Sequence, residues 1–343
     1  MQDSSAWVYA RSGVCYACCM AQQFPAEKRA PTESENVRVR PREKDPLTEA
    51  ALNPGNNISS RDNKWLKKFR YALRGTGPLQ GEPIATEGPK LVEEGIRSGL
   101  EAEALLVSDS GERHLERILQ AASVSESGIP RSRIFRTTDK LFESVAGTES
   151  PQGVAAFFRQ PEWNFDDVMR GRANEGGAYR SEAPLLVVMA MVQDPGNVGT
   201  IVRSAEAFGA TGVIAGRGAA DPWSPKALRA SAGSALRLPL LRGLAIPVLL
   251  AQLRMARVKI LATGTRPGDG SSVKGANTDA SITDMRSACA VFIGNEGSGL
   301  PSEVEHAADE WVYISMNEDV ESLNAGVAAS VILFEAARQR RGM

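Results

Sequence analysis

Hydrophobic and polar positions follow two periods along this chain, and their alternation first marks out a small α/β region between residues 84 and 160. Apolar residues recur at helical spacing in three segments and gather into short strand-like runs in three others. Helices are expected at 91–100, 114–122 and 140–145, and strands at 104–108, 134–135 and 154–158. Their alternation predicts a small α/β domain of residues 57–162.

A second alternation begins at Pro184 and is more strongly apolar. Strands are expected at 185–192, 212–215, 259–263, 290–293 and 311–315, with helices between them. Near-continuous apolar strands separated by helices predict a parallel sheet covered on both faces. Ligands of such sheets bind beyond the carboxyl ends of the strands, so the loops that follow these strands are the candidate site.

A basic amphipathic helix is expected at 64–74, ahead of the small domain's first strand. Its cations alternate with aromatic and aliphatic residues, as in Lys64-Trp65-Leu66-Lys67-Lys68-Phe69-Arg70. Such a run is most often a solvated helix face. It also suits an RNA backbone, because cations can contact phosphates while aromatic rings stack on bases. The segment alone leaves both interpretations open.

The remaining segments do not read as domains. Residues 1–56 are rich in Pro, Glu, Arg and Asn in their second half and are predicted to be disordered, or to reflect a start assigned too far upstream. Residues 163–182 contain several glycines among mixed charges and are expected to be a linker between the small domain and the domain of residues 183–343.

Composition narrows the function classes. The 343 residues carry 40 Lys and Arg against 41 Asp and Glu, which excludes a polycation but allows a local basic patch. The longest apolar run, 183–192, is about half of a membrane span, so a soluble protein is expected. Four cysteines and two isolated histidines form neither a disulfide framework nor a four-ligand metal set. We therefore expect a cytoplasmic protein without a bound metal.

Three loops after the apolar strands carry the candidate chemistry. In the first, Asn197 opens a helix on which Arg203 points away from the apolar stripe, either to solvent or into a cleft that binds phosphate. The second, residues 294–301, holds three glycines without the dinucleotide-binding spacing. The third ends in Ser322 and Asn324, which could simply cap the last helix.

Taken together, the loops resemble the three signature motifs of the SpoU (TrmH-type) RNA ribose 2′-O-methyltransferases of the SPOUT superfamily. The motifs, in order and over about 160 residues, are Asn197-x-Gly199-x-x-x-Arg203, Gly294-Asn295-Glu296-Gly297-x-Gly299-Leu300, and Ile314-x-Met316 followed by Glu321-Ser322-Leu323-Asn324. Asp221-Pro222-Trp223-Ser224-Pro225-Lys226 also resembles the family's segment between motifs. Two positions depart from the pattern: Ser315 stands where the family usually has Pro, and Ala325-Gly326 replaces the commoner Val-Ser or Val-Ala after Asn324.

The resemblance implies a trefoil-knot domain that binds S-adenosylmethionine and acts as a homodimer, with the first motif near the partner subunit. It implies that Thr263, Gly294, Ile314 and Leu323 hold the cofactor largely through the main chain. It places Arg203, Asn197, Glu296, Ser322 and Asn324 in the catalytic site, with Asn197 and Arg203 facing the RNA and Arg203 activating the ribose hydroxyl. No metal is required.

The first α/β region resembles the substrate-binding domain of ribosomal members, whose fold is like that of ribosomal protein L30e. The matching residues are Ser60-Arg61-x-Asn63, Glu87-Gly88 and Pro151-Gln152-Gly153-Val154. This resemblance favours RNA contacts for Lys64, Lys67, Lys68 and Arg70, and large-subunit (23S) ribosomal RNA as the substrate. The alternatives are transfer RNA, an RNA-binding protein without catalysis, and a nicotinamide oxidoreductase that lacks its fingerprint.

Overall fold

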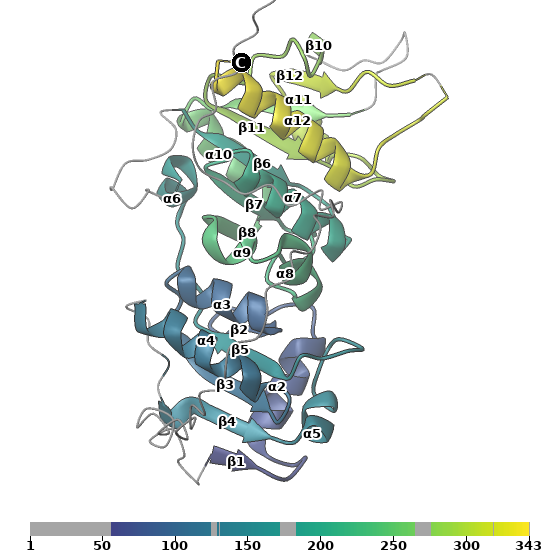
Figure 1. The fold of residues 1–343 in the computed structure, drawn as a ribbon. Coiled ribbons are helices and arrows are strands. Elements are labelled where there is room, and N and C mark those ends of the chain that lie inside the picture. Colours follow the sequence, from purple (N-terminus) through teal and green to yellow (C-terminus); the bar gives the residue numbers. More distant parts are fainter. Residues whose placement is uncertain are drawn as a thin grey trace, which may run out of the picture. The chain divides into compact units, whose positions relative to one another are not determined.

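The computed structural model describes residues 56–124, 129, 131–171, 183–264, 276–317 and 319–342. These residues belong to one compact unit, residues 50–343. They form two β-sheets, one from purple and blue segments and one from teal, green and yellow segments in Figure 1. The segment predicted to be disordered lies outside the described residues, apart from Asn56.

The smaller sheet has five strands in the order β1-β4-β3-β5-β2, and β5 runs antiparallel to both of its neighbours. The strands are β1 (Asn57–Ile58), β2 (Ile84–Glu87), β3 (Ala102–Ser108), β4 (Ile134–Thr137) and β5 (Val154–Phe158). The helices are α2 (Lys64–Arg74), α3 (Pro89–Arg97), α4 (Glu112–Val124) and α5 (Asp139–Glu143), with a 3-10 helix η2 (Arg131–Arg133).

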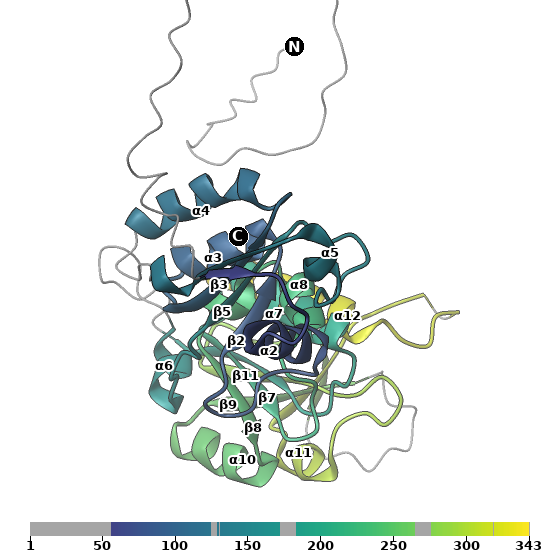
Figure 2. The same ribbon diagram turned by 90° about the horizontal axis from the view of Figure 1, so that it is seen from below.

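Helices cover both faces of the smaller sheet, with α3 and α4 on one face and α2 on the other (Figure 2). Helix α2 begins after Asn63, whose side-chain oxygen accepts the N–H of Trp65 at 2.8 Å. Leu66, Phe69 and Leu73 recur at helical spacing and are buried against the sheet. The predicted basic helix is therefore confirmed with its predicted bounds.

The larger sheet has seven parallel strands in the order β10-β12-β9-β11-β6-β7-β8. The strands are β6 (Leu185–Met189), β7 (Gly212–Gly216), β8 (Leu240–Leu244), β9 (Lys259–Thr263), β10 (Ala276–Asp279), β11 (Cys289–Ile293) and β12 (Glu310–Tyr313). The helices are α7 (Pro195–Ala207), α8 (Pro225–Ser231), α9 (Ser234–Arg237), α10 (Ile246–Met255), α11 (Ser302–Ala307) and α12 (Ala325–Arg340). Within the described ranges, every helix is too short or too polar to cross a membrane.

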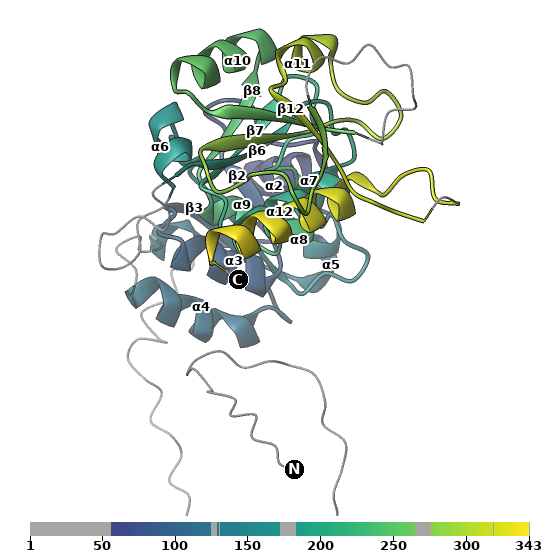
Figure 3. The ribbon, with the colours of Figure 1, turned by 90° about the horizontal axis from the view of Figure 1, so that it is seen from above.

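The central strands feed two separate hydrophobic cores. In β6, Leu185 and Val187 point into a core shared with α7 and α12, whereas Leu186 and Val188 point into a core shared with α10 and α11. Figure 3 shows these two pairs of helices on opposite sides of the sheet. A strand covered on both faces must be apolar at every position, and this explains the uninterrupted apolar run in the sequence.

Four strands, β1, β2, β8 and β10, were not predicted, and each has polar residues in its pattern. Strands β8 and β10 are the two edges of the larger sheet, and they include Arg242 and Asn277. In β2, Glu87 is buried because its carboxylate accepts the N–H of Gly147 at 2.7 Å. Edge positions and satisfied buried carboxylates both break the apolar alternation by which strands are recognised.

The segment predicted to be a linker contains a further helix, α6 (Phe165–Arg170). A capping box starts it: Asn164 accepts the N–H of Asp167 at 3.1 Å, and Asp167 accepts the N–H of Asn164 at 2.8 Å. Val168 is fully buried against Gly212 of β7. A Cβ atom added to Gly212 would lie only 2.5 Å from the Cβ atom of Val168. This part of the expected linker is therefore packed on the larger sheet, while residues 172–182 lie outside the described residues.

Candidate active site

Three polar side chains from three sequence motifs meet at the carboxyl edge of the larger sheet. The Nδ2 atom of Asn197 donates to Oε1 of Glu296 at 2.8 Å. The Nδ2 atom of Asn324 donates to the same Oε1 at 2.8 Å and to Oδ1 of Asn197 at 2.9 Å. Because β6 and β11 are paired neighbours, the loops that carry Asn197 and Glu296 leave the sheet side by side.

The start of α12 holds two members of the polar cluster Asn197–Glu296–Asn324, namely Glu296 and Asn324. Asn324 is the N-cap of α12, and its Oδ1 accepts the N–H groups of Gly326 and Val327 at 3.0 and 3.3 Å. Oε1 of Glu296 also accepts the N–H of Ala325 at 3.1 Å. The carboxylate thus lies at the N-terminus of α12, where the helix dipole favours negative charge.

The first turn of α7 is fixed from outside the helix. Its N-cap Asp194 accepts the N–H of Gly196 at 3.2 Å and pairs with Lys226 of α8 at 2.6 Å. The hydrogen bond from Lys226 is the main reason why the pKa of Asp194 lies below its usual value. Lys226 belongs to the segment between motifs, so that segment fixes the start of the helix carrying Asn197.

The glycine-rich second motif closes on itself directly after β11. Asn295 and Gly299 exchange main-chain hydrogen bonds of 2.9 and 3.0 Å. A Cβ atom on Gly294 would lie 2.6 Å from the carbonyl of Gly299, so the loop requires glycine there. The Oδ1 atom of Asn295 accepts the N–H groups of Gly297 and Ser298, which fixes the loop that presents Glu296.

Three of the four residues expected to hold the cofactor lie at the ends of the neighbouring strands β12, β9 and β11, and the fourth, Leu323, lies directly before the N-cap of α12. Thr263 is the last residue of β9, and Gly294 directly follows β11. The Thr263 hydroxyl donates to the carbonyl of Phe292 in β11 at 2.8 Å. Ile314 and Leu323 are half-buried, and their main-chain groups make no hydrogen bond to the described residues. Free main-chain groups at the strand ends fit a nucleoside held through the main chain.

Arg203 and Ser322 do not join the polar cluster. Both are exposed, and neither side chain makes a hydrogen bond or an ion pair within the part of the chain that the structure describes. Arg203 lies six residues after Asn197 on α7, which places it on a different side of the helix. Across the described ranges, no group of His, Cys, Asp or Glu side chains is arranged to hold a metal ion.

The four cations of α2 that are predicted to bind RNA differ in their surroundings. Lys64 and Lys67 are exposed, and Lys67 pairs with Asp62 at 3.0 Å. Lys68 is exposed with its Nζ 5.6 Å from the centre of the Trp65 ring. Arg70 is half-buried and donates to the carbonyl of Ser144 at 3.1 Å, so it also stabilises its own domain.

Asp279, which sequence reasoning missed, explains the departure at Ser315. Its carboxylate accepts the hydroxyl and the N–H of Ser281 at 2.6 and 2.9 Å, and those of Ser315 at 2.6 and 3.0 Å. These hydrogen bonds, those of Ser281 first, lower the pKa of Asp279 to about 2. A proline at position 315 could donate neither hydrogen bond. Serine at this position therefore connects the loop after β12 to Asp279 at the end of β10.

Comparisons with known proteins agree with the two-sheet architecture and the motifs. The model of the SpoU rRNA Methylase family matches residues 184–334, and that of an MRM3-like substrate binding domain matches residues 81–156. An uncharacterized tRNA/rRNA methyltransferase of Mycobacterium ulcerans is 32% identical, over 77% of this chain and 81% of that protein. The 23S rRNA (guanosine(2553)-2'-O)-methyltransferase RlmP of Bacillus subtilis is 28% identical, over 81% of this chain and 97% of that protein.

Solved structures give the same fold. The crystal structure of an AdoMet-bound rRNA methyltransferase from Sinorhizobium meliloti matches with a TM-score of 0.65 and 25% identity, over 82% of this chain and 97% of that chain. The fold is therefore that of a SPOUT trefoil-knot methyltransferase preceded by a substrate-binding domain, as predicted.

The chain belongs to the SpoU family of S-adenosylmethionine-dependent RNA methyltransferases. The predicted family, fold class, methyl donor and enzyme class, an RNA 2′-O-methyltransferase, are confirmed.

The hydrogen bonds to Asp279 make stability depend on pH. Its folded pKa of about 2 lies below the value of about 3.9 expected in the unfolded chain. The ionised group therefore stabilises the fold above about pH 4, and this contribution is lost as the pH falls towards about 2. The free energy of unfolding of Asp279→Asn, measured by urea denaturation, should therefore fall less between these pH values than that of the unmodified chain.

The control for this experiment is Asp319→Asn, because Asp319 is exposed and makes no side-chain hydrogen bond or ion pair within the described residues. It should retain the original pH profile. A profile for Asp279→Asn that coincides with that of the unmodified chain would contradict the role of the carboxylate.

Proposed function

We propose that this enzyme methylates a ribose 2′-hydroxyl in ribosomal RNA. The polar cluster Asn197–Glu296–Asn324 at the ends of the strands that carry the family motifs is the observation that supports it most. The match to a substrate-binding domain and the printed names of the relatives in Bacillus subtilis and Sinorhizobium meliloti support ribosomal RNA over transfer RNA.

We propose that the polar cluster positions the ribose. A 2′-hydroxyl is a poor nucleophile at neutral pH, so it must be aligned and its proton drawn away. Bound S-adenosylmethionine supplies an electrophilic methyl group. Oε1 of Glu296 is occupied by three N–H donors, whereas Oε2 makes no hydrogen bond within the described residues and can accept one from the ribose.

In this proposal, Arg203 supplies the positive charge of the site and Ser322 a hydroxyl. A guanidinium stays protonated and can bind a phosphate through two parallel hydrogen bonds. Held beside the hydroxyl, it would favour the developing alkoxide. The exposure of Arg203 and Ser322 leaves both side chains able to contact RNA.

The homodimer is the second part of the proposal, and an apolar stripe on α12 supports it. Val327, Val331 and Phe334 recur at helical spacing and are 47%, 40% and 57% exposed. Phe334 also contacts Phe208, at the end of α7, with ring centres 5.8 Å apart. An apolar helix face of this kind is typical of an interface between protein chains. The cytoplasmic location predicted from cysteine usage stays a prediction.

Methyl transfer tests the substrate directly. Purified enzyme, labelled S-adenosylmethionine and either total ribosomal RNA or total transfer RNA are incubated, and the products are digested to nucleosides. We expect label in a 2′-O-methylated nucleoside from the ribosomal pool, because the substrate-binding domain matches that class. Label in transfer RNA alone, or in a methylated base, would contradict the proposal.

Replacing Arg203 tests its catalytic role. Arg203→Ala should bind S-adenosylmethionine as before, by calorimetry, but transfer methyl groups about 10²–10⁴-fold more slowly, because the charge that activates the hydroxyl is lost. Arg286→Ala is the matched control, since Arg286 is also exposed but lies before β11, at the opposite end of the strands. Full turnover by Arg203→Ala would remove Arg203 from the mechanism.

A charge in the α12 stripe tests the dimer. Phe334→Asp and Val331→Asp should each shift the mass in light scattering from that of a dimer to that of a monomer, because a carboxylate is costly to bury in an apolar interface. Met255→Asp is the control, as Met255 is 85% exposed on α10. A monomeric unmodified chain, or dimers in both stripe variants, would refute the interface.

A further inference from the structure

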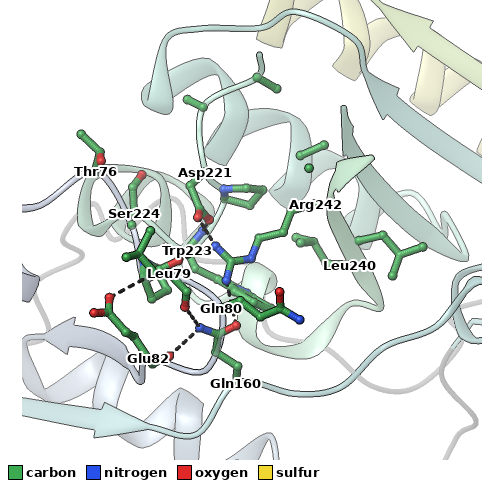
Figure 4. Close-up of a pocket in the computed structure, with 18 of the residues that line it drawn as sticks. Thr76, Leu79, Gln80, Glu82, Gln160, Asp221, Trp223, Ser224, Leu240 and Arg242 are labelled. Atoms are coloured by element: carbon green, nitrogen blue, oxygen red, sulfur yellow. Dashed lines mark hydrogen bonds and ion pairs between the residues drawn. The ribbon is translucent and has the colours of Figure 1, made fainter. Parts of the chain in front are cut away.

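A large cleft opens between residues 75–83 of the smaller domain and the larger sheet (Figure 4). Its volume is about 1340 Å³. Pockets for small molecules usually enclose about 300–1,000 Å³ and are mainly apolar. This cleft is larger and more polar, so its dimensions suit a segment of a polymer.

The inner wall of the cleft is held by Arg242 of β8. Its guanidinium pairs with Asp221, donates to the carbonyl of Pro78 at 2.6 Å and to Oε1 of Gln160 at 2.7 Å, and lies 4.7 Å from the centre of the Trp223 ring (Figure 4). These contacts join residues 75–83 to the larger sheet. The donors of Arg242 are therefore used within the protein, and the wall is fixed before any ligand arrives.

One of the cations that line the cleft has no carboxylate partner among the described residues. Four basic side chains line it, and three of them pair with carboxylates: Arg242 with Asp221, Arg159 with Glu101 at 2.7 Å, and Lys226 with Asp194 at 2.6 Å. The fourth, Arg217, is exposed, and its side chain has no hydrogen-bond or ion-pair partner among the residues that the structure describes. Its guanidinium is therefore available to an anion from outside.

Four carboxylates also line the cleft. Asp221 pairs with Arg242, and Glu82 accepts the N–H of Leu79 at 3.0 Å. The side chains of Glu103 and Glu162 have no partner among the described residues, so the positive charge available in the cleft is local to Arg217.

The position of Arg217 connects the cleft with the active site. It directly follows β7, and its N–H bonds to the carbonyl of Leu244 at 2.8 Å, so its main chain is fixed. Strand β7 is the neighbour of β6, after which Gln193 and Pro195 line the cleft just ahead of Asn197. One end of the cleft thus lies beside the loop that carries the polar cluster.

The other end of the cleft leads to the basic helix. Residues 75–79 and Trp223 also line an adjoining pocket together with Lys68 of α2, whereas Lys64 and Lys67 line neither hollow. The cleft therefore continues from the loop beside the polar cluster, past Arg217, to the pocket that Lys68 lines. A phosphate of a strand that leaves the active site is the anion that the guanidinium of Arg217 is placed to bind.

We propose that this cleft holds the single-stranded RNA segment beside the methylated nucleotide, and that Arg217 is its phosphate contact. The inference rests on the proposed function, because it places the substrate of the same active site. Arg217 is a binding residue and takes no part in methyl transfer itself.

The salt dependence of binding tests this contact. Each phosphate contact with a single strand contributes about 0.7 to the slope of log K against log salt concentration. With a fluorescein-labelled oligouridine of about 20 nucleotides, Arg217→Ala should bind about threefold more weakly at low salt and lose about 0.7 of that slope. Arg217→Lys should restore most of both, because a lysine can bind phosphate as a point charge.

Activity separates this inference from the proposed function. On total ribosomal RNA, Arg217→Ala should raise KM about threefold and leave kcat and S-adenosylmethionine binding unchanged, while Arg286→Ala changes none of these. Failure of the unmodified enzyme to methylate ribosomal RNA would refute the proposed function. An unchanged slope and KM in Arg217→Ala, a lost cofactor affinity or lowered melting temperature, or no oligouridine binding by the unmodified enzyme would overturn the role of Arg217.

Discussion

The candidate active site depends on one carboxylate oxygen. Oε1 of Glu296 accepts N–H groups from Asn197, Asn324 and Ala325, which come from the starts of α7 and α12. Two of these contacts bridge 99 and 28 residues of sequence. Because a single acceptor fixes both helix starts against the glycine-rich loop, the strand ends keep one geometry. Gly294 and Leu323, two of the four residues expected to hold the cofactor, lie in the segments fixed in this way.

Hydrogen bonding within the protein distinguishes the residues that build the site from those that are available to substrate. Asn197, Glu296 and Asn324 satisfy one another, whereas Arg203 and Ser322 are exposed and have no partner among the described residues. Around the cleft, Arg242 pairs with Asp221 and donates to the carbonyl of Pro78, whereas the side chain of Arg217 has no partner among the described residues. An arginine whose donors are used within the fold cannot also bind RNA without breaking those bonds.

Two small departures from the family pattern show how local chemistry is adapted to tertiary contacts. Serine at position 315 donates two hydrogen bonds to Asp279, which a proline could not do. Gly326, which replaces a larger residue common in the family, lies where a Cβ atom would meet Thr200 of α7 at 3.0 to 3.1 Å. The close approach of α12 to α7 therefore favours a small residue at this position.

Sequence by itself determined the helices and strands with strong periodicity, the covered parallel sheet and the three motifs. The all-apolar β6 and the spacing of Leu66, Phe69 and Leu73 leave few alternatives, because burial on both faces or on one face sets the pattern. Tertiary structure decided the edge strands β8 and β10, the helix α6 in the expected linker, and which side chains meet. Pairing between distant loops depends on strand order and not on local spacing, so the sequence could name Glu296 and Arg203 but could not show that only the first joins the cluster.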